Sequence, residues 1–127
     1  MWMSFLAVSA GAVIGANLRW LLGLWLNSSY HTILPGTLVA NLVGGWLIGL
    51  LIGYFSHDTT LAPEWRLFAI TGLCGALTTF SAFSLEMFAA FQEGKWGLAL
   101  AGILLHVVGS ILMTALGIYV HSLLRSG

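Results

Sequence analysis

Charged residues are scarce in this chain of 127 residues: only 6% are Asp, Glu, Lys or Arg, against about 25% in ordinary globular domains. Four basic and four acidic residues give a net charge of zero, which indicates no basic patch for nucleic acid or for an anionic membrane surface. A single cysteine, Cys74, excludes an intrachain disulfide framework. The apolar content of 59% and the mean hydropathy of +0.98 exclude a disordered chain and indicate an integral membrane protein.

Four long apolar runs predict four transmembrane helices, at about residues 3–26, 34–55, 64–91 and 96–124. Short polar turns separate them, the first at 27–32, and Pro63 suits the first turn of the third helix. The runs are continuous rather than alternating, which excludes a β-barrel, and we expect no signal peptide because the N-terminus lacks a basic region. We therefore predict an all-α membrane protein with a single transmembrane domain over residues 1–127.

The Lys and Arg residues are evenly divided between the two sides of the predicted bundle. Arg66 and Arg125 lie on the side that holds both termini, and Lys95 and, loosely, Arg19 lie toward the other. Because a Lys/Arg bias sets orientation, this balance favours dual topology, in which copies insert both ways. The alternative is one orientation set by weaker signals. Four helices are too few for one copy to enclose a polar path, so we also expect an oligomer.

Small and polar residues recur every fourth position in three of the predicted spans. The stripes are Ala7, Gly11, Gly15, Arg19 and Gly23; Thr37, Asn41, Gly45, Gly49 and Gly53; and Gly102, His106, Ser110 and Thr114. The glycines predict close helix packing. The polar members need partners or water, because polar groups are costly in lipid. Each polar residue also has an interpretation without a functional role. The Arg19 side chain could extend to the nearer membrane surface, Asn41 could form an interhelical hydrogen bond, and His106 could be a buried packing residue.

The third predicted span contains the least helical stretch, TGLCGALTTFSAFS at 71–84. Its two glycines and adjacent threonines predict a helix broken in mid-membrane, where freed carbonyls and helix ends can bind ions. Phe80 and Phe83 follow on one face, with Glu86 three residues further on. The alternative interpretation of the two phenylalanines is lipid contact or core packing. The alternative for Glu86 is that its side chain extends to the nearer membrane surface. No catalytic motif and no histidine pair with metal-ligand spacing occurs, so we predict neither an enzyme nor a histidine metal site.

Three segments, in a match that extends over the whole chain, resemble the Fluc/CrcB family of fluoride channels: GAVIGANLRW at 11–20, GTLVANLVG at 36–44 and GALTTFSAFS at 75–84. The third is the most specific, since it is long and unusual for a membrane helix. The resemblance implies a passive fluoride channel of the bacterial inner membrane that lowers cytoplasmic fluoride. It also implies an antiparallel, dual-topology homodimer with two pores, in agreement with the charge balance.

The resemblance implies particular residues as well. The implied fluoride path consists of Phe80, Phe83, Asn41, Ser81, Ser110, His106, Arg19, Thr37 and Glu86. The electropositive edges of aromatic rings can face an anion. Asn41 would donate its amide to the ion, and Arg19 would draw anions toward a vestibule. A structural sodium ion at the dimer interface would be held by the main-chain carbonyls of Gly75 and Thr78.

One position departs from the family pattern Thr-Thr-Phe-Ser-Thr-Phe, because this chain has Ala82 in the fifth place. Without this threonine hydroxyl, the path has one polar group fewer to replace the water molecules around fluoride. We therefore predict slower conduction with the fold intact. His106 stands where many relatives carry tyrosine.

Two other functions fit parts of the pattern. A small proton-coupled multidrug transporter also has four spans, but it needs a membrane carboxylate, for which Glu86 is the candidate. A non-transporting membrane scaffold would account for the glycine stripes. Ion flux through the purified protein separates a channel from a scaffold.

Overall fold

The computed structural model describes residues 1–27 and 34–127, and every regular element in these ranges is helical. Four helical segments are long and apolar enough to cross a membrane: α1 (Trp2–Leu26), α2 (Pro35–His57), the series Pro63–Gln92, and α6 (Trp96–Ser126). The prediction of four apolar spans is confirmed. The predicted turn at 27–32 lies, apart from Asn27, outside the described residues.

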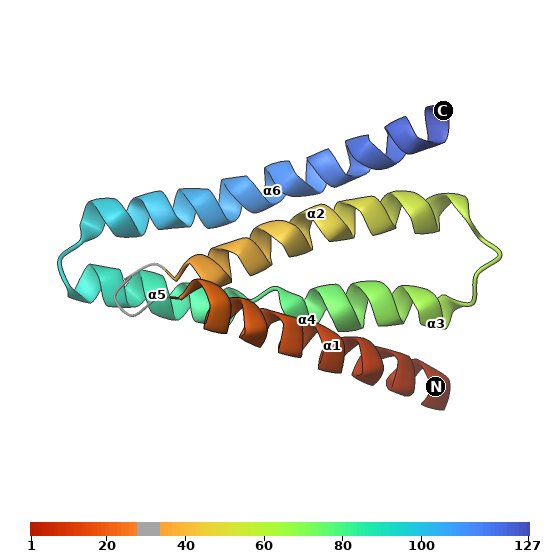
Figure 1. Cartoon of the computed structure of the whole chain (residues 1–127), viewed down its shortest axis with the longest axis horizontal. Helices are drawn as coiled ribbons and strands as arrows, with labels where there is room; N and C mark the ends of the chain where they lie inside the picture. The colour runs from red at the N-terminus through yellow and green to blue at the C-terminus, as the bar shows by residue number, and fades with distance from the viewer. Residues whose placement is uncertain (28–33) are drawn as a thin grey trace.

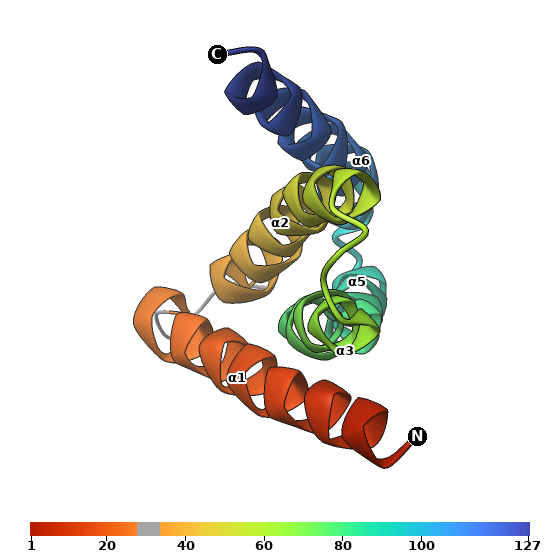
Figure 2. The ribbon, with the colours of Figure 1, turned by 90° about the vertical axis from the view of Figure 1, so that its right-hand side faces the viewer.

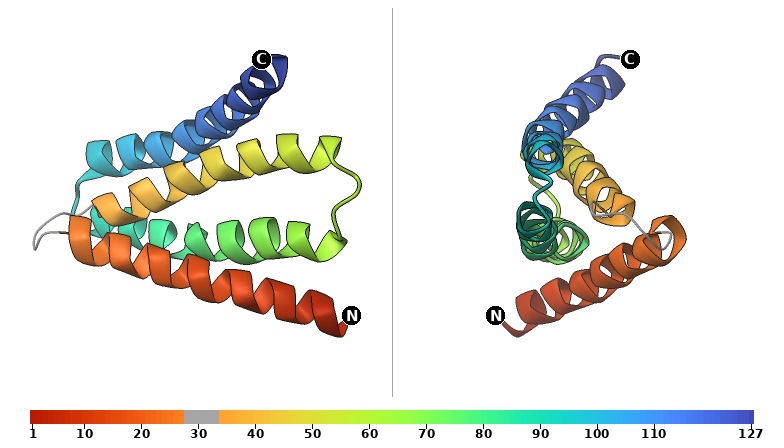
Figure 3. Two further views of the ribbon diagram at one scale, coloured as in Figure 1. Left: turned by 45° about the vertical axis from the view of Figure 1, so that its right-hand side comes forward. Right: turned by 90° about the vertical axis from the view of Figure 1, so that its left-hand side faces the viewer.

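The segments run alternately up and down, so that both termini lie at the same end of the bundle (Figure 1). α1 and α6 lie at opposite edges, with α2 and the Pro63–Gln92 series between them (Figures 2 and 3). Many large apolar side chains are exposed along all four segments, as a bilayer requires of its protein surface.

The third segment is a series of four helical pieces. α3 (Pro63–Arg66) leads into η1 (Leu67–Cys74), a π-helix, and then into the short α4 (Gly75–Leu77). Two residues in extended conformation follow, Thr78 with φ −82° and ψ 155° and Thr79 with φ −150° and ψ 122°. α5 (Phe80–Gln92) begins directly after them. The backbone is therefore non-helical at Thr78 and Thr79.

The small-residue stripes lie where helices approach most closely. α2 packs along α6, and α1 packs against η1 and α4. A Cβ atom built on Gly45 of α2 would lie only 2.9 Å from the carbonyl oxygen of Ser110 in α6. On the other side of the bundle, a Cβ atom on Gly11 of α1 would lie 2.8 Å from the backbone nitrogen of Leu73. Larger residues at these positions would push the helices apart.

Candidate functional site

The site is centred on Asn41 of α2, whose side-chain amide binds the non-helical backbone of the third segment. Its Oδ1 accepts a hydrogen bond from the Thr79 N–H at 2.7 Å, and its Nδ2 donates to the Thr79 carbonyl at 3.1 Å. The two hydrogen bonds fix which end of the amide carries oxygen and which carries nitrogen. Asn41 is only 9% exposed. The interhelical hydrogen bond that the sequence left open for this residue is therefore present.

The same amide also binds His106 of α6. Asn41 Nδ2 lies 3.0 Å from His106 Nδ1, and both residues are buried. Because an amide nitrogen only donates, Nδ1 must be the acceptor, and in a neutral imidazole the proton is then on Nε2. His106 Nε2 is fully enclosed and has no hydrogen-bond partner among residues 1–27 and 34–127. The site thus holds one buried N–H donor that the protein does not use.

Two aromatic rings from α5 lie beside this imidazole. The Phe83 ring centroid is 4.6 Å from that of His106 and 5.4 Å from that of Phe80, which it meets edge to face. Phe83 is 6% exposed, whereas Phe80 is 75% exposed and points out of the single chain. In this edge-to-face pair the electropositive C–H edge of one ring meets the face of the other.

A cavity of about 350 Å³ opens among these residues. Its lining includes seven residues that the sequence assigned to the fluoride path or the sodium site: Asn41, Gly75, Thr78, Phe80, Phe83, His106 and Ser110. No charged residue lines it. The sequence-predicted residues that lie outside the lining are Arg19, Thr37, Ser81 and Glu86.

Glu86 and Thr37 form a second buried polar pair, one turn toward the C-terminus of α5 and one turn toward the N-terminus of α2. The Thr37 hydroxyl donates to Glu86 Oε1 at 2.5 Å, and the Leu34 N–H donates to Oε2 at 3.4 Å. The side chains of Glu86 and Thr37 are 7% and 8% exposed. In this single chain, Glu86 is thus held inside the protein rather than extended to the membrane surface.

Arg19 of α1 binds the end of α4. Its Nε donates to the Ala76 carbonyl at 3.1 Å, and the contact is partly buried. Carbonyls in the last turn of a helix lack intrahelical donors and carry partial negative charge, so they favour a cation. Arg19 therefore has a protein partner inside the span.

Backbone carbonyls at the interruption lose their helical donors. In a continuous α-helix the N–H of residue i+4 would donate to the carbonyl of residue i. The Thr79 N–H donates to Asn41 instead, and the Ala82 N–H donates to Thr79 Oγ1 at 3.2 Å. The carbonyls deprived in this way are those of Gly75 and Thr78, which are the two that the resemblance assigned to sodium.

Thr79 is the residue of this site that sequence reasoning did not select. Its backbone binds Asn41, and its hydroxyl caps α5 and lies 3.2 Å from the Ser81 hydroxyl. Ser81 itself is exposed, and the Ala82 methyl group is half-buried. The available signal was the run of two β-branched threonines, which marked the interruption but not the residue that Asn41 would bind.

Comparison with known proteins identifies the family. The family described as CrcB-like protein, Camphor Resistance (CrcB), matches residues 6–118. A Marinobacter nauticus protein called fluoride-specific ion channel FluC is 76% identical over 125 residues, covering 98% of this chain and 99% of the relative. Proteins with the same name from Chromohalobacter salexigens and Pseudomonas aeruginosa are 58% and 57% identical, over 93% and 94% of this chain and 89% and 94% of theirs. The resemblance inferred from the sequence is confirmed, and the chain belongs to the CrcB family.

Proposed function

We propose that this chain is a fluoride-selective ion channel that lets fluoride leave the cell down its gradient. The relatives named fluoride-specific ion channel cover almost the whole chain, and they support this function directly. Passive export is useful because the weak acid HF enters cells and dissociates at the higher internal pH, which releases fluoride inside. No enzymatic step is needed.

The observation that carries the proposal is the unused N–H of His106, whose ring lies against Phe83 in a cavity that Phe80 also lines. A small, strongly hydrated anion can give up water only where donors replace it. A buried N–H supplies one strong donor, and ring edges supply weaker electropositive contacts. The lack of charge around the cavity also fits transient binding, since a channel site must release its ion as readily as it takes it up.

The role of Asn41 follows from its hydrogen bonds. Both amide hydrogens are used, one by the Thr79 carbonyl and one by His106 Nδ1. A donation from Asn41 to fluoride would therefore replace one of these two hydrogen bonds. We propose that Asn41 sets the tautomer of His106 and meets the ion by exchanging the hydrogen bond to His106.

The other path residues would extend the route on either side of the cavity. Thr37 and Glu86 would form the polar step next to Asn41 along α2 and α5. Ser110 lines the cavity, and Ser81 lies next to Thr79. The Arg19 guanidinium binds Ala76 through Nε, and its positive charge would attract anions.

We propose an antiparallel homodimer with dual topology as the functional unit. The even balance of Lys and Arg between the two sides supports insertion in both orientations. Exposed polar and small residues in the third segment also favour a partner: Thr71, Gly75, Ser81 and Ser84. Lipid gives such groups no hydrogen bonds, whereas a second copy of the segment could.

A structural sodium ion fits the carbonyls at the interruption. Sodium is a hard cation that prefers oxygen ligands, as calcium does. The Gly75 and Thr78 carbonyls have lost their helical donors, and Gly75 is exposed. Two carbonyls are too few to coordinate the ion, so a second copy would be needed to complete the coordination. This requirement agrees with a site at the dimer interface.

The proposed membrane is the bacterial inner membrane. Four apolar helices, rather than alternating strands, support insertion into that membrane.

Fluoride release from liposomes that carry the purified full chain tests the function. A fluoride electrode records the release, and chloride-loaded liposomes serve as the control. We expect rapid fluoride release with little chloride release. Equal release of both ions, or of neither ion even after Ala82→Thr, would refute a fluoride-selective channel.

A further inference from the structure

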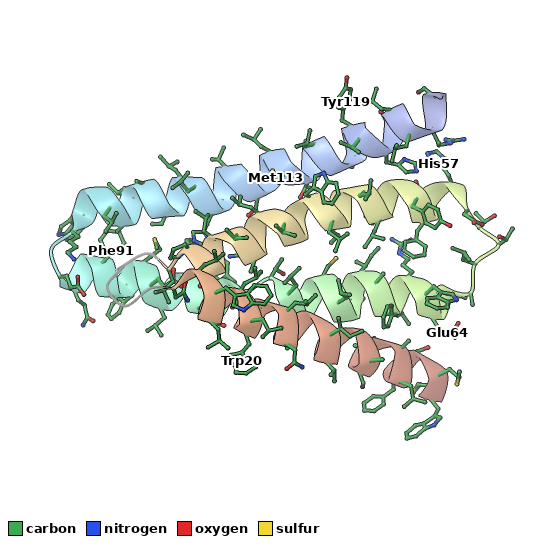
Figure 4. All side chains as sticks on the ribbon, viewed as in Figure 1. Trp20, His57, Glu64, Phe91, Met113 and Tyr119 are labelled. Atoms are coloured by element: carbon green, nitrogen blue, oxygen red, sulfur yellow. The ribbon has the colours of Figure 1, made fainter. Side chains whose placement is uncertain are left out.

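A second cavity, of about 450 Å³, lies between α2 and α6 near the C-terminal end of α6, far from the α5–α6 turn. Figure 4 shows His57 at this end of α2, beside the last turns of α6. The lining residues are Ile52, Gly53, Ser56, His57, Ile118, His121, Ser122, Arg125 and Ser126. None of them belongs to the proposed fluoride path.

The wall of this cavity contains a buried imidazole without a hydrogen-bond partner. His121 is only 9% exposed, and no donor or acceptor in residues 1–27 and 34–127 binds it. Its ring is parallel to that of His57, with the centroids 5.5 Å apart and an interplanar angle of 7°. His121 and His57 both line the cavity.

The position of His121 is built into the helix packing. A Cβ atom on Gly53 would lie 2.6 Å from both Cγ and Nδ1 of the His121 ring. Any larger residue at position 53 would displace the imidazole. Gly53 thus leaves the space that the imidazole occupies, and the His57 ring stacks beside it.

The remaining polar lining favours an anion. Arg125 contributes a guanidinium group, and no carboxylate lines the cavity. The nearest acid in the sequence, Asp58, accepts hydrogen bonds from the N–H and hydroxyl of Thr60 instead. The Ser56 and Ser122 hydroxyls donate to carbonyls of their own helices and can rotate to donate to a ligand. A guanidinium with nearby imidazoles and hydroxyls is the donor set that binds phosphate.

The location further specifies the ligand. Ile52 and Ile118 give the cavity apolar walls that continue toward the bilayer. Tyr119 at this end of α6 (Figure 4) and Tyr54, next to Gly53 in α2, are both exposed. Tyrosines in membrane proteins concentrate at the level of the lipid headgroups. A ligand that fits must therefore combine a phosphate with an apolar body.

We propose that this cavity binds the phosphate headgroup of an anionic lipid, held by Arg125, His121 and His57. The guanidinium takes two phosphate oxygens, and the imidazoles donate N–H groups to the others. Basic pockets between transmembrane helices bind lipid headgroups by the same physics. The positive charge of Arg125 opposes a transition-metal ion on the two imidazoles.

The test is a titration of the full chain, labelled with ¹⁵N at histidine, in neutral detergent micelles. The ligands are phosphatidylglycerol, phosphatidylcholine at the same mole fraction, and inorganic phosphate against chloride at equal ionic strength. His57→Gln and His121→Gln assign the two imidazole signals, and His106 serves as the internal reference. We expect saturable shifts of the His57 and His121 signals with phosphatidylglycerol, and binding about tenfold weaker to phosphatidylcholine.

Arg125→Gln is the decisive variant, because Arg125 is exposed and its loss leaves the helix packing intact. We expect it to weaken the binding of phosphatidylglycerol about tenfold or more, whereas the matched variant Arg66→Gln leaves binding unchanged. Unaltered binding by Arg125→Gln, or no saturable shift with any phosphate ligand, overturns the proposal. Saturation by inorganic phosphate as tight as by lipid keeps the phosphate site and overturns the lipid assignment. A response to ZnCl₂ alone would replace it with a metal site.

Discussion

The side-chain amide of Asn41 pairs with both backbone polar groups of Thr79, so one side chain binds the backbone at the point where the third segment is interrupted. Unsatisfied backbone groups are costly at this depth in a membrane. Asn41 therefore stabilises the interruption and, through its hydrogen bond to Nδ1, also determines where His106 carries its proton. The stability of the interruption and the chemistry of the cavity depend on the same amide.

Replacing Asn41 with Leu, which has a similar volume, should reduce both stability and flux. The variant leaves the Thr79 N–H without a partner and removes the hydrogen bond from Asn41 to the Thr79 carbonyl, and a buried group left unpaired costs about 1–3 kcal/mol. Thermal unfolding in detergent and fluoride efflux from liposomes measure the two effects. Asn17→Leu is the control, because the Asn17 amide binds only Val13 of its own helix and is exposed. Equal melting temperatures for the two variants would contradict the role of Asn41.

The unused donor of His106 is tested by a pair of aromatic replacements. His106→Phe keeps a ring against Phe83 but removes both nitrogens, so we expect fluoride flux to fall by about tenfold or more. His106→Tyr puts a hydroxyl donor back into the same region and should conduct faster than the Phe variant. Fluoride efflux from liposomes with the same protein density compares the rates of the two variants. If Phe conducts as fast as the parent, the imidazole N–H does not meet the ion.

Replacing Phe80 or Phe83 should reduce fluoride flux without disrupting the oligomer. Phe80→Ile and Phe83→Ile each remove a ring that lines the cavity, while keeping an apolar side chain. We expect reduced fluoride release and an unchanged oligomer in size-exclusion chromatography. Phe88→Ile is the matched control, since Phe88 lies on α5 outside the lining and is exposed. Parental flux from both cavity variants would remove the aromatic rings from the proposed path.

Ala82→Thr should raise the fluoride flux. Ala82 lies in the first turn of α5, next to Ser81, and an added hydroxyl there would extend the polar groups beside the two phenylalanines. It would replace part of the water that fluoride loses on entering the path. Ala89→Thr makes the same chemical change at another half-buried position of α5 and should leave the flux unchanged. An unaltered rate in Ala82→Thr would show that the missing hydroxyl does not limit conduction.

The four spans could be predicted because each apolar run is long enough by itself to require a helix in lipid. Contacts made by backbone atoms could not be predicted in the same way. Thr79 acts through its N–H and carbonyl, which every non-proline residue possesses, so its identity does not reveal that Asn41 binds it. The proton position on His106 depends on the orientation of that amide, which only the folded arrangement fixes.

The π-helical turn and the second cavity lay beyond sequence analysis for a different reason. η1 passes within close range of α1, where a Cβ atom on Gly72 would lie 2.9 Å from the Cα of Gly11. A glycine stripe predicts that helices approach, but not which hydrogen-bond pattern the partner helix adopts. A net charge of zero likewise concealed the grouping of Arg125 with His57 and His121, since these residues come together only when α2 and α6 pack.

The hydrogen bond between Arg19 and Ala76 has a consequence for how the chain is made. Its two residues are separated by 57 positions, so the first helix reaches the membrane long before its partner carbonyl is synthesised. Until the third segment arrives, the guanidinium must be accommodated by water, by lipid headgroups or by the insertion machinery. The lasting membrane placement of the first helix is therefore completed late, when the third segment inserts. A chain truncated before residue 76 should hold its first helix less deeply in the bilayer than the full chain does.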